Sequence, residues 1–336
     1  MRIKITAIRE AADRALVHYG YDEGERATIL DVLLYAQLRG NSQGVVKLVG
    51  RGIPKDKSAG KITTVKETPV SAIIDGAGNH AMVVVSHAAN VAIEKAKKSG
   101  IGIVGVHGIS TSSGAIGAYA RTIAQAGFAS IVSASGPPTV ALHGSSEALM
   151  CTNPLAIAAP RMYADPIVLD ITTASMAYFA VMQESIAGRA LPEGVAYDRE
   201  GNPTRDASKA LDGALTTMDK GKRGSGLAFM LQILAGPLVG SEFFGIEGSG
   251  KGSSGHVLVA IDPEILAGFD TFSRSVEMMV ERAKAARRIP GVDEILLPGE
   301  RGDRATNEVI DKGEIEIDEK LWNELKSVGT LDAGKN

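Results

Sequence analysis

The histidines are the first side chains to examine for chemistry, because their ring nitrogens bind metals and transfer protons near neutral pH. His80 and His87 are seven residues apart, which puts them on one face of a helix. No carboxylate or other histidine has the spacing of a further ligand. We therefore expect no metal site. The chain has six histidines, at positions 18, 80, 87, 107, 143 and 256.

Two glycine-rich stretches resemble phosphate-binding motifs in sequence, but their context does not fit those motifs. Residues 100–105 read Gly-Ile-Gly-Ile-Val-Gly, but these glycines would lead from a helix into a strand, whereas the dinucleotide fingerprint leads from a strand into a helix. Residues 245–252 come within one position of a P-loop, yet Gly252 stands where a magnesium-binding Ser or Thr is needed. The first stretch predicts a helix cap and a core strand. The second predicts a loop that could close over a ligand.

Composition narrows the class of protein. The 336 residues include 36 Lys plus Arg and 39 Asp plus Glu, and a net charge of −3 gives no reason to expect nucleic acid or an anionic membrane as a partner. The apolar stretches are too short to span a bilayer, and the first residues lack the apolar region of a signal peptide. A single cysteine, Cys151, excludes an internal disulfide. We expect a cytoplasmic, globular enzyme.

Helical and strand patterns alternate along the chain without a clear linker, which predicts an α/β fold. Asp22 and Glu25 have the spacing of a capping box for a helix that ends near Gly40. A second helix is expected to follow the turn at residues 76–78 and to end near Gly100, and another is expected from Thr173 onwards. The remaining expected helices are 114–126, 224–238, 263–286 and 319–326, and the expected strands are 70–75, 101–106, 129–134, 167–170, 257–262 and 295–297.

One segment resembles a family signature. Residues 36–47 read Ala-Gln-Leu-Arg-Gly-Asn-Ser-Gln-Gly-Val-Val-Lys, which is similar to the Arg-Gly-x-x-Ser-His-Gly-x-x-Arg signature of the malate/L-lactate dehydrogenase-like family of NAD(P)-dependent oxidoreductases. Several further segments are similar to the family. Each of them alone is weak evidence, but together they occur in the family's order and cover nearly the whole chain. The other similar blocks are residues 152–160, 167–173, 191–204, 224–228 and 296–301.

The resemblance implies a non-Rossmann α/β fold, in which a mixed sheet binds NAD or NADP and a helical substrate domain is built from both chain ends. Residues 76–263 would form the dinucleotide-binding sheet domain. Residues 1–75 and 264–336 would form the helical part for substrate binding and dimerisation, with soft boundaries. The resemblance also implies a homodimer and a small carboxylate-bearing substrate.

By position in the family, one set of residues is implied to line the cofactor. Asp170 would end a strand and Thr172 would begin a helix, whose free N–H groups and hydroxyls suit an anion. Lys222 or Arg223 would supply a cation for phosphate oxygens. The implied cofactor residues are Gly136, Asp170, Ile171, Thr172, Lys222, Arg223, Gly299, Glu300 and Arg301.

The implied catalytic positions depart from the family. Gln43 stands where the acid/base histidine follows the signature Ser42, and Ser112 aligns with a second family histidine. An amide cannot titrate and a serine hydroxyl is a poor acid at neutral pH. Lys47 replaces the signature arginine. Arg51, four residues later, would share a helical face with Lys47 and help to hold a substrate carboxylate.

Two explanations of these departures stay open. The chain is either a non-catalytic homologue that still binds a dinucleotide or metabolite, or an enzyme whose chemistry needs no strong protein acid. Reduction of a ketone needs an acid, whereas a cyclic iminium already carries its proton. His143 or His107 could replace the lost acid. The reading favoured by the cofactor segments is an NAD(P)-dependent oxidoreductase acting on a 2-oxo, 2-hydroxy or cyclic 2-imino acid.

Overall fold

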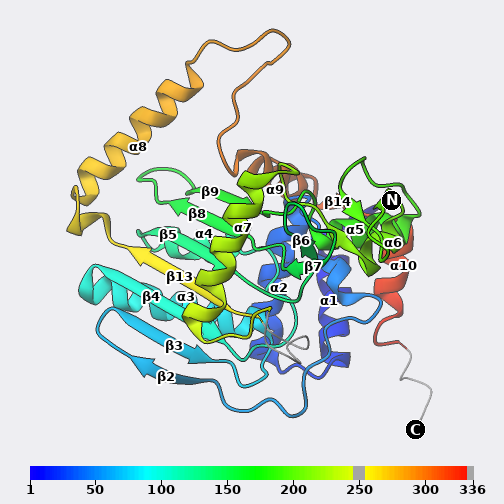
Figure 1. Ribbon diagram of the computed structural model, residues 1–336. Helices are drawn as coiled ribbons and strands as arrows, with labels where there is room; N and C mark the ends of the chain where they lie inside the picture. The colour runs from blue at the N-terminus through cyan, green and yellow to red at the C-terminus, as the bar shows by residue number, and fades with distance from the viewer. Residues whose placement is uncertain (245–253, 331–336) are drawn as a thin grey trace.

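A seven-stranded mixed sheet is the centre of the computed structural model, which describes residues 1–244 and 254–330 (Figure 1). Its order is β2-β3-β4-β13-β5-β8-β9, in which β3 and β4 are parallel and the other neighbouring pairs are antiparallel. A Rossmann sheet is mostly parallel, so the predicted non-Rossmann α/β fold is confirmed. The strands are β2 (Thr63–Glu67), β3 (Ser71–Asp75), β4 (Ile101–His107), β5 (Ala129–Ala134), β8 (Leu155–Ala159), β9 (Ile167–Ile171) and β13 (His256–Ile261).

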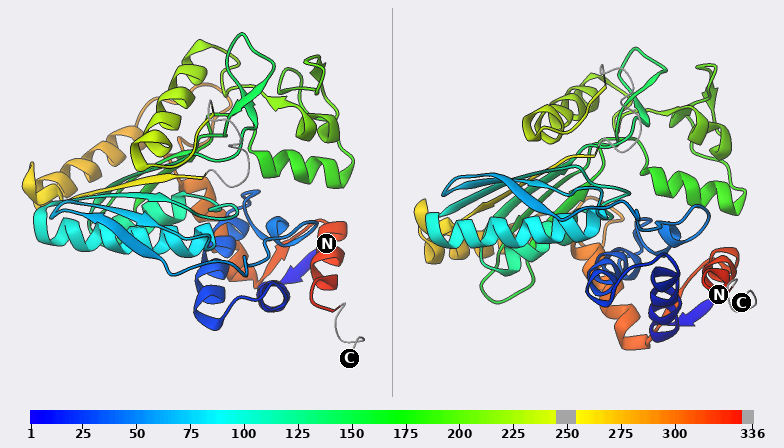
Figure 2. Two further views of the ribbon diagram at one scale, coloured as in Figure 1. Left: turned by 60° about the horizontal axis from the view of Figure 1, so that its bottom comes forward. Right: turned by 90° about the horizontal axis from the view of Figure 1, so that it is seen from below.

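Helices cover both faces of this sheet. α3 (Ala81–Ser99) and α4 (Gly117–Gln125) pack on one face, and α7 (Lys222–Ala235) lies on the other (Figure 2). Because side chains alternate along a strand, Leu258 and Ala260 of β13 are fully buried in the main core. On the alternate positions Ile103, Ile131 and Ile157 form an exposed apolar row across β4, β5 and β8.

The two ends of the chain meet in a second, helical layer. β1 (Arg2–Lys4) pairs with β14 (Glu314–Glu316), α1 (Ile5–His18) packs against α10 (Glu319–Ser327), and α2 (Glu23–Leu38) packs against α9 (Glu300–Lys312). The predicted capping box is present, since Asp22 accepts from the Glu25 N–H while the Glu25 carboxylate accepts from the Asp22 N–H. A helical part made from both chain ends is therefore present in the fold.

The division after residue 75 does not follow the sheet. β2 and β3 lie within residues 1–75, yet they are the first two strands of the seven-stranded sheet. Their register with β4 places them among the sheet elements, not among the terminal helices. We propose that the boundary lies before Thr63.

A smaller unit stands on the α7 side of the large sheet. It has its own core, which includes Val140, Met150 and Val181. α8 (Phe269–Lys284) leads away from the rest of the molecule and buries only Ser273 of its side chains (Figure 1). The remaining elements are β6 (Val140–Ala141), β7 (Ala148–Met150), β10 (Ala196–Tyr197), β11 (Pro203–Thr204), β12 (Ala214–Leu215), α5 (Tyr178–Ala187), α6 (Ala207–Asp212) and the 3₁₀ helices η1 (Val45–Leu48), η2 (Pro237–Val239) and η3 (Pro263–Ile265).

Local signals placed most elements correctly. Gly100 ends α3 with a φ of +78° and β4 follows directly, as the first glycine stretch predicts. The helix predicted over residues 263–286 is present as α8, but its predicted start is wrong, because Gly268, with a φ of +81°, separates η3 from α8. The predicted strand at residues 295–297 is also wrong. That segment is a loop held by the Lys284 amine and the Glu300 carboxylate. The P-loop-like residues 245–252 lie outside the described residues.

The predicted helix from Thr173 is wrong. α5 begins only at Tyr178. The N–H groups that a helix start would leave free are used elsewhere: Thr173 N–H bonds to the Thr152 carbonyl, and Ser175 N–H bonds to the Thr216 carbonyl. This junction therefore offers no helix N-terminus to an anion.

Candidate active site

The signature segment folds back against the end of α2. The Val45 N–H donates to the Gln37 side-chain oxygen at 3.0 Å. A Cβ on Gly44 would lie 2.3 Å from that oxygen, so only glycine allows this close approach. The return path directs the short helix η1 inward, and Lys47 follows it into the protein.

Lys47 is the least expected feature of the site. Its side chain is buried, with 2% of the residue exposed, and its Nζ donates to Ser112 Oγ at 2.8 Å. Nζ also lies 3.1 Å from the centre of the Phe179 ring. Burial lowers the pKa of this amine well below its ordinary value, since no carboxylate among the described residues pairs with it.

Lys47 and Arg51 do not share a helical face. η1 ends at Leu48, and Arg51 is exposed whereas Lys47 is buried. That part of the prediction is wrong, because a 3₁₀ turn of four residues cannot carry an i, i+4 pair. Arg51 instead acts electrostatically on Tyr178 at the start of α5, where its charge opposes the burial that raises the pKa of the tyrosine.

Ser112 belongs to a strained loop between β4 and α4. Thr111 has a φ of +62°, which is rare for a β-branched residue. Its buried Oγ1 has no hydrogen-bond partner among the described residues. Ser112 Oγ accepts from Lys47 Nζ and, at 3.3 Å, from the Gly114 N–H. The two positions that aligned with lost family side chains, Lys47 and Ser112, are thus in direct contact.

His80 adjoins this pair, and sequence reasoning missed it. Its Nδ1 accepts from the Met82 N–H as the cap of α3, while its buried Nε2 has no partner among the described residues. Burial, and then the nearby Lys47, lower the pKa of His80 to about 3, so it is neutral at physiological pH. A histidine directly before an apolar helix was the available signal, because a neutral ring nitrogen can cap a helix.

The other predicted side chains surround this group or lie apart from it. Gln43 is partly buried and its N–H donates to Asn41 Oδ1, while Ser42 is also partly buried. His143 is exposed and its N–H donates to Ser225 Oγ at the start of α7. His107 Nδ1 lies 3.9 Å from Asp75 Oδ1. In the described part of the chain, no hydrogen bond joins His143 or His107 to Lys47 or Ser112.

The first group of predicted cofactor residues lies at the end of β9. Asp170 Oδ2 accepts from the Gly117 N–H at 2.9 Å, and desolvation raises the pKa of this carboxyl to about 6. Its neighbour Ile171 ends the strand, and the Thr172 hydroxyl donates to the Thr152 carbonyl. The loop before α9 packs alongside, since a Cβ on Gly299 would lie 3.0 Å from the Val168 oxygen. In the same turn Glu300 pairs with Lys284 and Arg301 is exposed.

The second group lies at the start of α7. Lys222 and Arg223 are exposed and have no ion-pair partner among residues 1–244 and 254–330. Asp219 accepts from the N–H groups of Gly221 and Gly224, so a phosphate would be bound by the two cations and not by those amides. The Met218 N–H donates to the Thr173 carbonyl, which connects this group to the end of β9.

Gly136 lies at the other end of α7, because the neighbouring Ser135 hydroxyl donates to the carbonyl of Ala235, the last residue of that helix. A Cβ on Gly136 would lie 3.1 Å from Cys151 Sγ and 3.4 Å from Ser254 Oγ, so glycine permits close packing. The exposed cations at the start of α7, which have no ion-pair partner among the described residues, suit phosphate oxygens. No group of three metal-binding side chains occurs within the described ranges.

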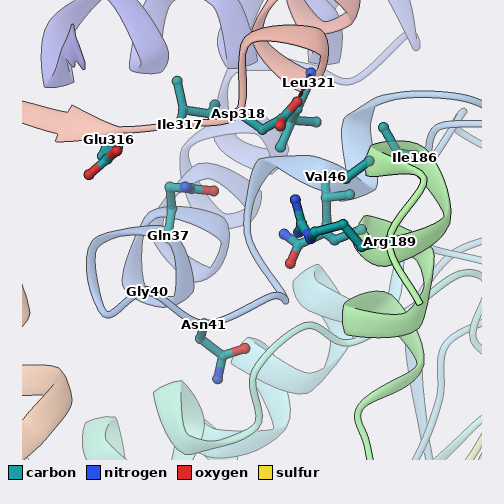
Figure 3. A pocket seen from close by; sticks show the side chains of 12 residues that line it. Gln37, Gly40, Asn41, Val46, Ile186, Arg189, Glu316, Ile317, Asp318 and Leu321 are labelled. Carbon is teal, nitrogen blue, oxygen red and sulfur yellow. Dashed lines mark hydrogen bonds between the residues drawn. The ribbon is translucent and has the colours of Figure 1, made fainter. Parts of the chain in front are cut away.

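The cavity in Figure 3 is separate from these groups. Its volume is about 230 Å³, and it lies between the end of α2, α5 and the start of α10. Arg189 points into it but is paired with Glu184. None of the predicted site residues lines the cavity. Among the described helices, none has the length and apolar character needed to cross a bilayer.

Comparison with known proteins decides the family. The family model described as malate/L-lactate dehydrogenase matches residues 3–326. The chain belongs to this family. It is 33% identical over 323 residues to a malate/(S)-sulfolactate dehydrogenase of Methanothermus fervidus, which covers 92% of this chain and 91% of that protein. It is 31% identical over 234 residues to a Δ1-pyrroline-2-carboxylate/Δ1-piperideine-2-carboxylate reductase of Pseudomonas syringae, covering 68% and 66% of the two chains.

The malate/L-lactate dehydrogenase family also includes solved structures with this fold. Sulfolactate dehydrogenase from Methanocaldococcus jannaschii has a TM-score of 0.80 and 29% identity, covering 98% of this chain and 97% of that one. The predicted family and fold class are therefore confirmed. Within this family, Lys47 and Ser112 both differ from the expected residues, and the two side chains contact each other.

Proposed function

We propose that this chain is an NAD(P)-dependent oxidoreductase that transfers hydride to or from a small carboxylate-bearing substrate. The substrate class is a 2-oxo/2-hydroxy acid or a cyclic 2-imino acid. The observation that carries the proposal is the meeting of the signature segment with the loop before α4, where Lys47 contacts Ser112 in a chain of this dehydrogenase family. The named activities of the relatives support both substrate classes.

The residues around Lys47 have separable roles in this proposal. Arg51, exposed near Tyr178, would pair with the substrate carboxylate. Gln43 would orient the substrate by hydrogen bonds and would not transfer a proton, because an amide has no accessible pKa. A bound nicotinamide would supply or accept the hydride. We propose Gly136, Asp170, Ile171, Thr172, Lys222, Arg223, Gly299, Glu300 and Arg301 as the residues that line the cofactor, and a cytoplasmic location in keeping with the single cysteine.

Cofactor binding should depend on Arg223. NADH or NADPH is expected to bind in the micromolar range, and Arg223→Ala should weaken binding about 10- to 150-fold, because a charge-assisted hydrogen bond is worth about 1.5–3 kcal/mol. Protein-induced fluorescence of the reduced cofactor measures this. Arg199→Ala is the matched control, an exposed arginine without an ion pair to the described residues. Equal affinities for all three proteins would contradict the role of Arg223.

We also propose that the chain works as a homodimer. Apolar side chains are exposed on α7, on the short helix η2 that follows it, and on α8. α8, which leads away from the body, exposes Met278 and Met279, by 67% and 72%. The exposed apolar residues of α7 and η2 are Phe229, Met230, Ile233, Leu234 and Leu238.

Light scattering should therefore give twice the 35.0 kDa mass of one chain. Met279→Glu should shift the protein toward the single-chain mass, because it would bury an unpaired charge in the interface. A wild-type protein that stays at the single-chain mass at micromolar concentration would refute the dimer.

A non-catalytic protein that binds a dinucleotide or metabolite is the second candidate. The loss of both family histidines, at Gln43 and Ser112, favours it. Cofactor binding without any hydride transfer would distinguish it from the enzyme.

A further inference from the structure

We propose that Ser112 and Lys47 form a proton relay, in which Ser112 protonates the oxygen of a 2-oxo acid and Lys47 reprotonates Ser112. This inference rests on the proposed function and narrows it to the 2-oxo/2-hydroxy acid pair. Ser112 would be the catalytic residue and Lys47 would act through it. The relay replaces the two histidines that this chain lacks.

Hydrogen-bond accounting at Ser112 carries the argument. A serine hydroxyl has one hydrogen to donate and two lone pairs that accept. Lys47 Nζ and the Gly114 N–H donate to Ser112 Oγ, at 2.8 Å and 3.3 Å, so both lone pairs are used. The hydroxyl hydrogen has no acceptor among the described residues, and the side chain is partly exposed. It is therefore free to donate to the oxygen of a bound substrate.

The surroundings of Lys47 suit an amine that gains and loses a proton. Nζ contacts the Phe179 ring and Ser112, and no carboxylate in residues 1–244 and 254–330 forms an ion pair with it. Lys47 acts electrostatically on the nearby His80, which is neutral because burial, and then Lys47, lower its pKa to about 3. Three tyrosines on or next to the helices that pack against η1, namely Tyr19, Tyr35 and Tyr178, have pKa values raised by burial. Burial without a counter-ion lowers the pKa of the Lys47 ammonium well below its ordinary value, so this group releases its proton more readily than an exposed lysine does.

The reaction balances in both directions. In reduction, hydride adds to the carbonyl carbon, the Ser112 proton moves to the carbonyl oxygen, and the Lys47 ammonium returns a proton to Ser112. The products are a 2-hydroxy acid, the oxidised cofactor and a neutral lysine, which then takes a proton from water. Oxidation of the 2-hydroxy acid reverses each transfer.

The test compares three site variants with a matched buried lysine. Lys47→Met and Ser112→Ala should each lower kcat for 2-oxo acid reduction by about 10²–10⁴-fold, the usual loss of a general acid. Lys47→Arg should lose as much, because arginine keeps the charge but does not release its proton. Lys95→Met should stay within twofold, since this buried lysine pairs with Glu67 away from the site.

Two readouts separate the relay from a structural role. In the wild type, kcat for reduction should fall as pH rises through the apparent pKa of Lys47, and Lys47→Met should lose that limb. Added methylamine should restore part of the activity of Lys47→Ala. Unchanged cofactor fluorescence titrations would show that the variants are folded and bind the cofactor.

Specific results would overturn the relay. A Lys47→Met protein within fivefold of wild type, with the same pH profile, would do so. A wild type that reduces only cyclic 2-imino acids, equally well with Lys47→Met, would overturn the relay and leave the proposed function standing. A wild type that binds no nicotinamide cofactor would remove the proposed function itself.

Discussion

Replacing Asp170 with Asn should stabilise the cofactor-free protein by about 2–3 kcal/mol at pH 8 and change its stability little at pH 4. The carboxyl lies against the start of α4 and accepts one hydrogen bond, from the Gly117 N–H. Desolvation raises its pKa in the folded protein from 3.8 to about 6.

The sign of the pH dependence follows from that shift. The folded protein holds this proton more tightly than the unfolded chain, so ionisation costs the folded state free energy. The contribution of Asp170 to stability is therefore greatest below pH 3.8 and is lost as pH rises toward 6. In Asp170→Asn the amide oxygen still accepts from the Gly117 N–H, and the side chain carries no charge. The variant therefore does not lose stability as pH rises toward 6.

Urea unfolding of both proteins between pH 4 and pH 8 measures the difference. Asp311→Asn, an exposed carboxylate on α9, is the control and should differ from wild type by less than about 0.5 kcal/mol at every pH. A difference between wild type and Asp170→Asn that does not change with pH would contradict the assigned burial of the carboxyl.

Elements governed by nearby residues were predictable from the sequence. The capping box at Asp22 and Glu25 and the left-handed cap at Gly100 both use contacts within a few positions, and both are present. The predicted helix at Thr173 fails because its N–H groups bond to Thr152 and to Thr216. Those partners come from separate segments, so no local pattern reports them.

The sequence likewise predicted only part of the candidate site. The signature pointed to Lys47 and Ser112 as two separate departures, but their contact joins segments 65 positions apart. The burial of Lys47 also depends on Phe179 from α5. A periodicity argument placed Lys47 beside Arg51 on a helix, whereas a 3₁₀ turn directs one inward and leaves the other exposed. Long-range packing, which the sequence does not display, decides which of the two charges is buried and which is exposed.

We expect this protein to transfer hydride between a nicotinamide cofactor and a small carboxylate-bearing substrate. In the presence of the wild type, NADH or NADPH should be oxidised when pyruvate, oxaloacetate or a cyclic 2-imino acid is added, and not without substrate. Gln43→Ala should slow the reaction roughly 5- to 150-fold, because losing an orienting hydrogen bond costs about 1–3 kcal/mol. Removing a proton donor can slow a reaction by up to about 10⁴-fold, which is more than the expected effect of Gln43→Ala.

The decisive measurement is the absorbance of the reduced cofactor at 340 nm, followed for the wild type with 2-oxo acids and cyclic 2-imino acids in parallel. We predict substrate-dependent oxidation of the cofactor with at least one class, and with 2-oxo acids if the Ser112–Lys47 relay operates. Cofactor binding with no oxidation by either class would contradict the assignment as an oxidoreductase and would favour the non-catalytic binding protein.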